Sequence, residues 1–269
     1  MARLLALVAL ATVTAGCRES IERRFIYYPS RPLAADPSSV GLPFRDVAFT
    51  AADGVRLHGW LIPGRTPTTL LYSHGNGGNI GGRVAIARLL ADQLGVGLFM
   101  YDYRGYGRSE GAPSEAGLVS DALGARAALL REGVAAEHVV YFGRSLGAAV
   151  TLDLALAHPP RAVVLESPFA SVSAMASTVL PGGGLLFRTR WDSLAKIPGL
   201  RAPLLMLHSD ADETIPYAQG RALFAAAPEP KTFFTIRGAH HYDMQATWRE
   251  YWAAWRAFLA TSAPAQAAR

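Results

Sequence analysis

The chain has 269 residues, 51% of them hydrophobic, and 26 basic against 21 acidic residues give a formal net charge of +5. This length and apolar content suffice for one large α/β domain with a substantial core. The basic residues are almost all arginine and are scattered along the chain, which argues against a nucleic-acid-binding surface, and the single cysteine excludes disulfide bonds within the fold.

The first residues are typical of an export signal. Arg3 precedes an apolar run, residues 4–13, that is too short to span a bilayer, which needs about 20 residues. The run ends at Thr14-Ala15-Gly16-Cys17, which is similar to the lipobox of bacterial lipoproteins, where the signal is cut before a cysteine that is then lipidated. The alternative is an ordinary secretory signal that is cut nearby.

We therefore expect residues 1–16 to be a signal peptide and residues 17–40 to be a tether that begins at the lipid anchor, Cys17. Within the tether, the run Arg24-Phe25-Ile26-Tyr27-Tyr28-Pro29 is expected to pack on the surface of the domain. Exported in this way, the protein would lie in the cell envelope, lipid-anchored to a membrane. Arg18, and not aspartate, follows the cysteine, which by resemblance to Gram-negative lipoproteins indicates the outer membrane. Residues 41–260 form the expected domain, and the alanine- and proline-rich residues 261–269 form a frayed tail.

Strand-like and helix-like runs alternate through the domain. Two runs flank Asp53-Gly54 and predict a hairpin, and Ser114 is placed to cap a helix. An antiparallel start followed by repeated βα units predicts a mostly parallel, doubly wound sheet of about eight strands. The expected strands are residues 47–50, 55–62, 69–73, 96–101, 138–142, 162–165, 204–208 and 232–236; the expected helices include 83–93, one from Leu146, one near 219–226 and a C-terminal one that carries Trp248, Trp252 and Trp255.

The stretch Gly143-Arg144-Ser145-Leu146-Gly147 matches G-x-S-x-G between an expected strand and an expected helix. Glycine on both sides allows a turn too tight for side chains, so the serine hydroxyl would stand clear of the sheet at a helix N-terminus. The competing interpretation is a glycine-rich turn that happens to contain serine.

A nucleophilic serine needs a base, an acid that orients the base, and donors for the oxyanion. The glycine-rich loop 74–79 follows a buried strand, so the backbone N–H of Asn76 could join that of Leu146 as an oxyanion donor. No phosphate-loop pattern occurs in this loop or elsewhere. Candidate acids lie at 210–213, and candidate bases are the adjacent His240 and His241; neighbouring histidines seldom hold one metal ion, so no metal site is expected.

These segments together resemble the α/β-hydrolase family, over about residues 24–260. The similar branch carries H-G-N-x-G-N, Y-D-Y-R-G-Y-G-x-S-x-G and G-x-S-x-G in series, here at 74–79, 101–111 and 143–147, and it includes bacterial hydrolases, serine aminopeptidase-like hydrolases and protein depalmitoylases. The resemblance places the acid at Asp212 and the base at His241, with Ser145 as nucleophile. Glu166 is the reserve acid.

The resemblance implies a serine hydrolase of carboxylic esters or thioesters that works through an acyl-enzyme and without a cofactor. A peptidase of the same fold and a non-catalytic binding lipoprotein are the alternatives. Residues 171–200 would form a small cap, in which Pro181-Gly182-Gly183-Gly184 provides mobility and Leu180, Leu185, Leu186 and Phe187 either line an acyl pocket or pack. Asp102 and Arg104 are expected to brace a turn. The natural substrate and the oligomeric state are not predicted.

Overall fold

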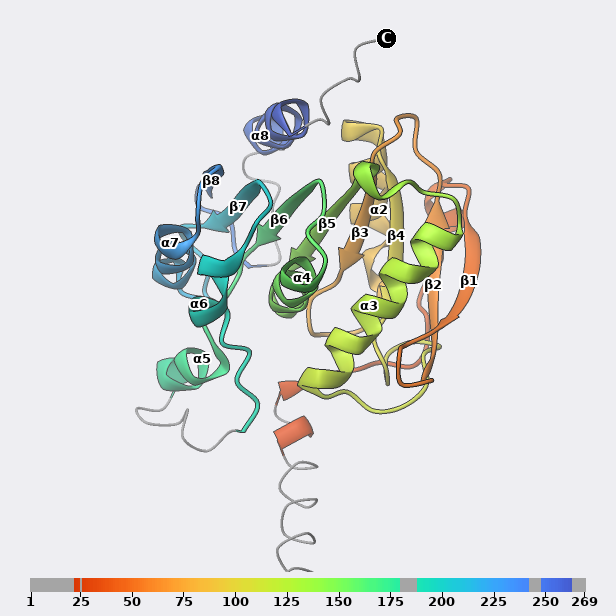
Figure 1. The fold of residues 1–269 in the computed structure, drawn as a ribbon, viewed down its shortest axis with the longest axis horizontal. Helices are drawn as coiled ribbons and strands as arrows, with labels where there is room; N and C mark the ends of the chain where they lie inside the picture. Colours follow the sequence, from red (N-terminus) through yellow and green to blue (C-terminus); the bar gives the residue numbers. More distant parts are fainter. Residues whose placement is uncertain (1–21, 25, 180–187, 242–247, 263–269) are drawn as a thin grey trace, which may run out of the picture.

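An eight-stranded sheet runs through the middle of the molecule, with helices against both faces (Figure 1). The computed structural model describes residues 22–24, 26–179, 188–241 and 248–262. The strands are β1 (Arg45–Thr50), β2 (Arg56–Ile62), β3 (Thr69–Ser73), β4 (Gly97–Asp102), β5 (Val139–Arg144), β6 (Ala162–Glu166), β7 (Leu204–Ser209) and β8 (Lys231–Ile236).

The strand order β1-β2-β4-β3-β5-β6-β7-β8 contains a reversal that positions the site. β1 pairs with β2, and β2 with β4, antiparallel; β4, β3, β5, β6, β7 and β8 pair in parallel. After β3 the chain goes first to one side, to β4, and then to the other side, to β5. Loops that leave the carboxyl ends of β3 and β5 therefore diverge and leave a crevice between them. The expected doubly wound, mostly parallel sheet is confirmed.

Each strand supplies two core layers because successive side chains point to opposite faces. In β3, Leu71 belongs to the layer under α3 and α4, whereas Leu70 and Tyr72 belong to the layer under α2 and α8. β5 divides in the same way, with Tyr141 on one face and Phe142 on the other. Both faces are apolar because both are covered, as parallel sheets require.

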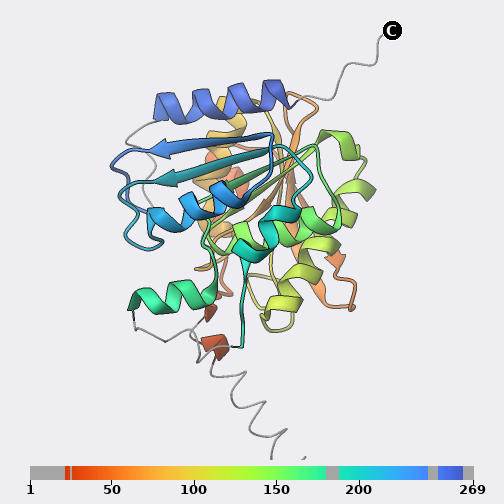
Figure 2. The same ribbon diagram turned by 60° about the vertical axis from the view of Figure 1, so that its left-hand side comes forward.

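The helices that cover the sheet separate into two layers. Figure 2 shows α8 on one side of β7 and β8 and α7 on the other. Ser114 caps α3 as expected, since its Oγ accepts from the Gly117 N–H at 3.1 Å. The helices are α2 (Val84–Leu94), α3 (Glu115–Arg131), α4 (Leu146–Ala157), α5 (Val172–Val179), α6 (Ser193–Lys196), α7 (Tyr217–Ala226) and α8 (Trp248–Thr261); short 3₁₀ helices are η1 (Pro37–Val40), η2 (Ile80–Arg83), η3 (Ala136–His138) and η5 (Ile197–Gly199).

The C-terminal helix buries Trp252 and Trp255 in the core. Trp252 is 4% exposed and Trp255 is fully buried, where its ring meets Phe142 edge to face with centroids 5.1 Å apart. The helix ends at Thr261, one residue past the expected domain end at 260. Most of the expected tail, residues 263–269, lies outside the described residues.

The segment before residue 41 packs on the domain more closely than a tether would. Tyr27 is 4% exposed, and its hydroxyl accepts from the indole N–H of Trp191 at 3.1 Å. Pro29 forms a bridge with Gly78, and Arg31 donates to the Ser109 carbonyl at 2.7 Å. The packed domain thus begins well before residue 41, because these residues cover apolar surface and bind the loops around the sheet.

Asp102 and Arg104 brace loops, as expected. Asp102 is fully buried and accepts from the Ile80 N–H at 2.8 Å. The Arg104 guanidinium pairs with two carboxylates, that of Asp53 at 2.7 Å and that of Asp121 at 2.8 Å. Burial raises the pKa of Asp121 to about 6 despite this partner.

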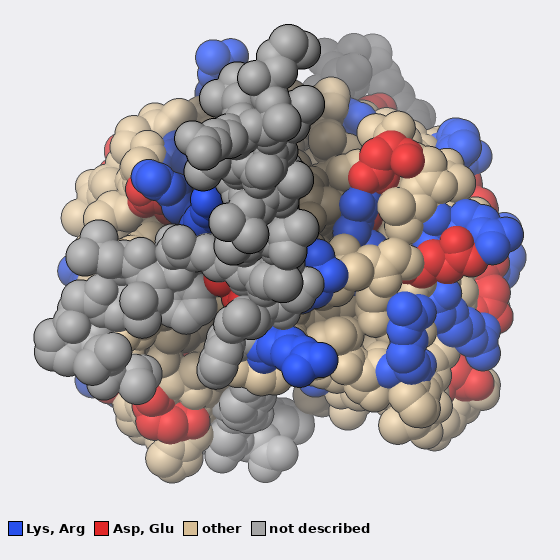
Figure 3. All heavy atoms as spheres, turned by 90° about the horizontal axis from the view of Figure 1, so that it is seen from below, with Lys and Arg blue, Asp and Glu red and all other residues tan. Residues whose placement is uncertain are grey.

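Charged side chains at the surface are mixed in sign. Basic side chains stand next to acidic ones on the uncovered part of the face in Figure 3. Ion pairs between exposed side chains of the described residues include Arg88–Asp92 at 2.6 Å and Arg108–Asp46 at 3.2 Å.

Residues 1–16 and Cys17 lie outside the described residues. In the ranges from residue 22 onward that the structure describes, we find no helix with the length and apolar character needed to cross a membrane.

Candidate active site

Ser145 stands at a sharp turn between β5 and α4. Its backbone is at φ 53° and ψ −120°, a strained conformation for a residue with a side chain. A Cβ added to Gly147 would lie 1.9 Å from the carbonyl oxygen of Ser73, and one added to Gly143 would lie 2.3 Å from that of Gly147. Both glycines of the motif are therefore required by close backbone approach, as expected for a turn too tight for side chains.

Asp212 and His241 come together at the neighbouring strand ends. Asp212 follows β7 and His241 follows β8, and the carboxylate Oδ2 lies 2.8 Å from the imidazole Nδ1. Oδ1 of the same carboxylate accepts from the N–H groups of Thr214 and Ile215 at 2.9 and 2.7 Å. Because Nδ1 has this carboxylate as its partner, proton transfer by the imidazole would use its other nitrogen, Nε2.

Asp212 remains ionised well into the acid range. Burial opposes ionisation, but hydrogen bonds from His208, His241 and the Ile215 N–H outweigh it and hold the pKa of Asp212 well below its usual value. His208 is fully buried on β7, with Nε2 3.5 Å from Asp212 and 3.0 Å from the Ile215 carbonyl oxygen. The His208 imidazole, which lies between the Asp212 carboxylate and the Ile215 carbonyl oxygen, thus helps to hold Asp212 in position.

Ser145 and His241 line one small hollow of about 30 Å³ together with Gly75 and Asn76. The backbone of His241 is held on both sides of the ring: its N–H donates to Glu213 at 3.0 Å, and its carbonyl oxygen accepts from the Arg144 guanidinium. The nucleophile and the base candidates thus face a common space, although their residues are almost a hundred positions apart.

The alternative acids and base occupy different positions. His240 is exposed, and its Nδ1 lies 3.2 Å from Glu213. Asp210 accepts from the Gly238 N–H at 2.8 Å. Glu166 lies 2.9 Å from Arg144 Nε and accepts from the Tyr251 hydroxyl at 2.7 Å. The hydrogen-bond partner of His241 Nδ1 is Asp212, and not His240, Asp210 or Glu166.

The loop after β3 lies against the serine. Register pairs Ser73 with Gly143, so residues 74–77 emerge beside Ser145, and a Cβ on Gly75 would be 3.6 Å from that of Ser145. Among the described residues, the backbone N–H groups of Asn76 and Leu146 donate to no other protein atom. Two such groups beside a serine can hold an oxyanion.

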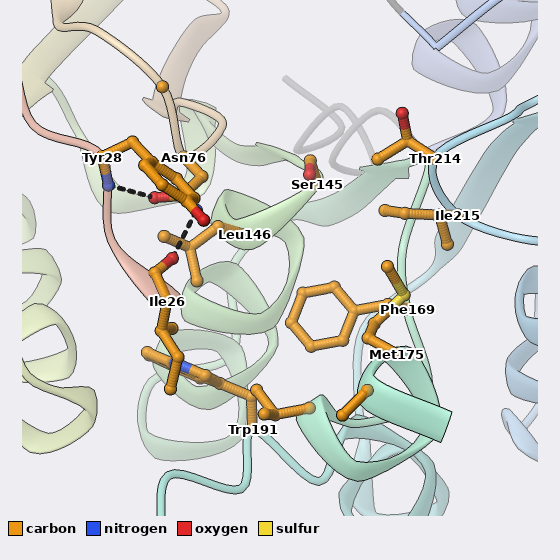
Figure 4. A pocket seen from close by; sticks show the side chains of 13 residues that line it. Ile26, Tyr28, Asn76, Ser145, Leu146, Phe169, Met175, Trp191, Thr214 and Ile215 are labelled. Atoms are coloured by element: carbon orange, nitrogen blue, oxygen red, sulfur yellow. Dashed lines mark hydrogen bonds between the residues drawn. The ribbon is translucent and has the colours of Figure 1, made fainter. Parts of the chain in front are cut away.

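An apolar pocket of about 480 Å³ opens on the other side of Ser145. Ser145 lies at one side of it and Trp191 at the opposite side (Figure 4). Phe169, Ile215 and Met175 line its length, and α5 from the expected cap supplies part of the wall. The cap residues Leu180, Leu185, Leu186 and Phe187, and the glycines 182–184, lie outside the described residues.

The N-terminal segment forms part of this pocket, which the sequence did not predict. Ile26 and Tyr28 line it. The Asn76 side chain binds both: its amide donates to the Ile26 carbonyl, and its Oδ1 accepts from the Tyr28 N–H at 3.1 Å (Figure 4). The apolar residues at 25–28 had indicated that this run packs on the domain, but not that it lines the pocket.

The described ranges hold no group of three or more His, Cys, Asp or Glu side chains placed to bind a metal ion.

The chain is similar to known proteins in sequence and in fold. A family model described as serine aminopeptidase matches residues 65–194. The alpha/beta hydrolase domain-containing protein WAV2 of Arabidopsis thaliana is 32% identical over 275 residues, covering 91% of this chain and 89% of WAV2. The chain belongs to the α/β-hydrolase family. Protein bem46 of Schizosaccharomyces pombe is also 32% identical, covering 86% of this α/β-hydrolase and 83% of bem46.

Solved structures share the fold of this α/β-hydrolase at low identity. An esterase of Pyrococcus furiosus superposes with a TM-score of 0.75 at 17% identity, covering 89% of this chain and 99% of the esterase. A puromycin-hydrolyzing peptidase of Mycobacterium tuberculosis superposes with a TM-score of 0.66 at 20% identity, covering 82% and 39%. These structures show the fold, and family membership together with the family model supports a hydrolase.

Substituting a glycine of the G-x-S-x-G turn should destabilise the protein. We expect Gly147→Ala to lower the free energy of unfolding by about 3 kcal/mol or more, because its Cβ would meet the backbone of β3, which cannot move alone. The measurement is urea denaturation. Gly82→Ala is the control, since no atom lies within 4 Å of the added carbon, and it should change stability by about 0.5 kcal/mol or less. Equal losses in the two variants would contradict the steric argument.

Proposed function

We propose that this chain is a serine hydrolase that cleaves carboxylic esters or thioesters through an acyl-enzyme. The observation that carries the proposal is the 2.8 Å bond between Asp212 and His241, at a hollow that His241 shares with Ser145. An apolar pocket meets this hollow at the same serine, where an acyl chain would lie. A turn, an acid and a base from three separate strand ends converge on this point.

In the proposed reaction Ser145 Oγ attacks the carbonyl carbon while its proton passes to His241 Nε2. The carbonyl π electrons move to oxygen, and the N–H groups of Asn76 and Leu146 hold the resulting oxyanion. Collapse breaks the bond between the acyl carbon and the leaving oxygen or sulfur, which takes the proton from His241. Water, deprotonated by His241, then releases the carboxylic acid and restores Ser145.

The apolar pocket favours an acyl substrate over a peptide. Its described lining residues include no carboxylate that would bind a peptide amino terminus, and its walls are mainly Ile, Phe, Val, Met and Trp side chains. The family model's description and the fold of the peptidase that hydrolyses puromycin support the peptidase as the second candidate. A non-catalytic binding lipoprotein is the third, and retention of all three triad residues argues against it.

We also propose that Cys17 carries a lipid anchor in the cell envelope, at the outer membrane in a Gram-negative cell. The supporting pattern is the lipobox-like sequence that ends at the single cysteine. Ile26 in the pocket wall lies nine positions after Cys17, so the tether can hold the pocket no more than about 30 Å from the anchor. An anchored enzyme would work on acyl substrates near the membrane surface.

Triad substitutions should produce unequal losses. We expect Ser145→Ala to lower kcat by about 10⁶-fold, and His241→Ala and Asp212→Asn by about 10⁴-fold or more, because the three act as a unit. Hydrolysis of a nitrophenyl ester and labelling by a fluorophosphonate measure this. The matched controls His240→Ala and Asp210→Asn should cost about tenfold or less, through geometry alone. Labelling that survives in Ser145→Ala would overturn the assignment, and a greater loss in Glu166→Gln than in Asp212→Asn would move the acid.

Activity should rise with acyl chain length and then stop rising. Each CH₂ that enters the apolar pocket contributes about 0.8 kcal/mol, so kcat/KM should climb about fourfold per carbon at most, with the best esters between about two and eight carbons. A nitrophenyl ester series, with thioester and aminopeptidase substrates alongside, measures this. A maximum at long chains would refute the size estimate, and faster cleavage of peptides than of esters would favour the peptidase.

Lipidation of Cys17 should move the protein from the aqueous phase into the detergent phase. We expect the wild type to enter the detergent phase and to incorporate a fatty-acid analogue, and Cys17→Ala to do neither, because no other thiol is present. Ser20→Ala, three residues along the same segment, is the control and should behave as the wild type. A wild type that takes up no label would exclude the anchor.

A further inference from the structure

The hollow that holds His241 differs in chemistry from the acyl pocket, although the two meet at the nucleophile. Three residues line both spaces, Asn76, Gly77 and Ser145. The acyl pocket continues into aromatic and aliphatic side chains. The hollow instead continues between two arginines, Arg83 and Arg144. A substrate bound across Ser145 therefore has an apolar environment on one side and a basic one on the other.

The two guanidinium groups of the hollow have different surroundings. Arg144 is compensated, because its Nε lies 2.9 Å from Glu166, a carboxylate that is itself 1% exposed. Arg83 is half-buried at the start of α2, and its guanidinium donates to the Gly77 carbonyl at 2.6 Å. In the described part of the chain, no carboxylate lies within ion-pair distance of Arg83. A cation beside the site thus keeps its charge available to a ligand.

The field of Arg83 reaches the groups beneath the loop. After burial, it is the next cause that lowers the pKa of His74, which falls to about 3. Arg83 also stabilises the ionised form of Asp102. None of the residues that line the hollow is acidic.

The position of His241 tells which part of a substrate the hollow receives. In acyl transfer the base returns its proton to the departing oxygen or sulfur, so the leaving group lies on the side of the histidine. Here that side is the hollow lined by His241 and Arg83. The volume, about 30 Å³, fits a group of a few atoms such as a carboxylate or the near oxygens of a phosphate, and not a second chain.

We propose that Arg83 forms an anion subsite for the leaving group, so that the preferred substrates are acyl esters or thioesters whose alcohol or thiol carries a carboxylate or phosphate near the scissile bond. The inference rests on the proposed serine esterase function. Arg83 is the specificity-determining residue of this subsite. A planar guanidinium that meets such an oxyanion forms charge-assisted hydrogen bonds, which a neutral leaving group cannot supply.

Three butyryl esters that share one phenol skeleton test the proposal in the full-length protein: those of 3-hydroxybenzoate, 3-hydroxyphenyl phosphate and the neutral 3-hydroxybenzamide. We expect kcat/KM for at least one anionic ester to exceed that for the amide ester by about tenfold. The ester with the larger ratio identifies carboxylate or phosphate. The ratio should fall as ionic strength rises from 0.01 to 0.1 M, since the screening length shrinks from about 30 to about 10 Å.

Variants of Arg83, which ends η2, and of Arg88 in α2 separate the subsite from general effects. Arg83→Gln should reduce the anionic-to-neutral ratio to near one, and Arg83→Lys should retain part of it, because the charge remains without the planar fork. Arg88→Gln is the control, since Arg88 lies five residues further on, in α2, and pairs with Asp92. The ratio is internal to each variant, so a loop displaced by loss of the bond to Gly77 cannot imitate the result.

The outcomes distinguish this inference from the function on which it rests. If none of the three esters is cleaved, the esterase proposal fails. If all three are cleaved at similar rates, or if Arg83→Gln leaves the ratio unchanged, the esterase proposal stands and the anion subsite is refuted.

Discussion

The parallel pairing of β3 with β5 is the constraint on which the candidate site depends. Register places Ser73 opposite Gly143, and the first turn of α4 packs onto the end of β3 so closely that Gly147 has no room for a Cβ. This approach puts Ser145 in its strained conformation and sets the Asn76 loop beside it. The apolar core on both faces of the sheet stabilises the strained backbone of Ser145, because a strained residue persists only where the surrounding structure fixes its conformation.

A buried polar network supports the same point from the other side. Arg144, next to Ser145, pairs with Glu166 at the end of β6, and Glu166 in turn accepts a hydrogen bond from the Tyr251 hydroxyl of α8. The Arg144 guanidinium also donates to the carbonyl oxygen of His241. Removing one partner of a buried ion pair costs about 3–5 kcal/mol, so these elements are coupled in stability. Such coupling keeps the base beside the nucleophile although the chain links them only distantly. The same arginine borders the proposed leaving-group subsite, so one side chain contributes to both structure and charge.

The site also depends on residues that precede the sheet. Tyr27 fills a buried position against Trp191, and the neighbouring Ile26 and Tyr28 complete the apolar pocket. An enzyme whose pocket wall continues directly into its tether would be oriented by that tether. Substrate choice and attachment would then be physically linked, which is the expectation that the proposed anchor adds to the fold.

Sequence alone determined the fold class and nearly every strand, because these follow from strand and helix periodicity, and it predicted the turn at Ser145 from the two glycines that a tight turn requires. Local rules gave only a set of candidate acids and bases at strand ends, and the family resemblance selected Asp212 and His241 among them. Only the tertiary structure separated His241 from His240 by geometry, since adjacent residues share every local signal and differ only in which ring reaches the Asp212 carboxylate. It also decided that residues 26–28 belong to the pocket and that Arg83 stands beside Ser145. Those contacts join segments that lie 50 or more positions apart, and their distance is set by the strand order of the sheet and not by neighbours in the chain.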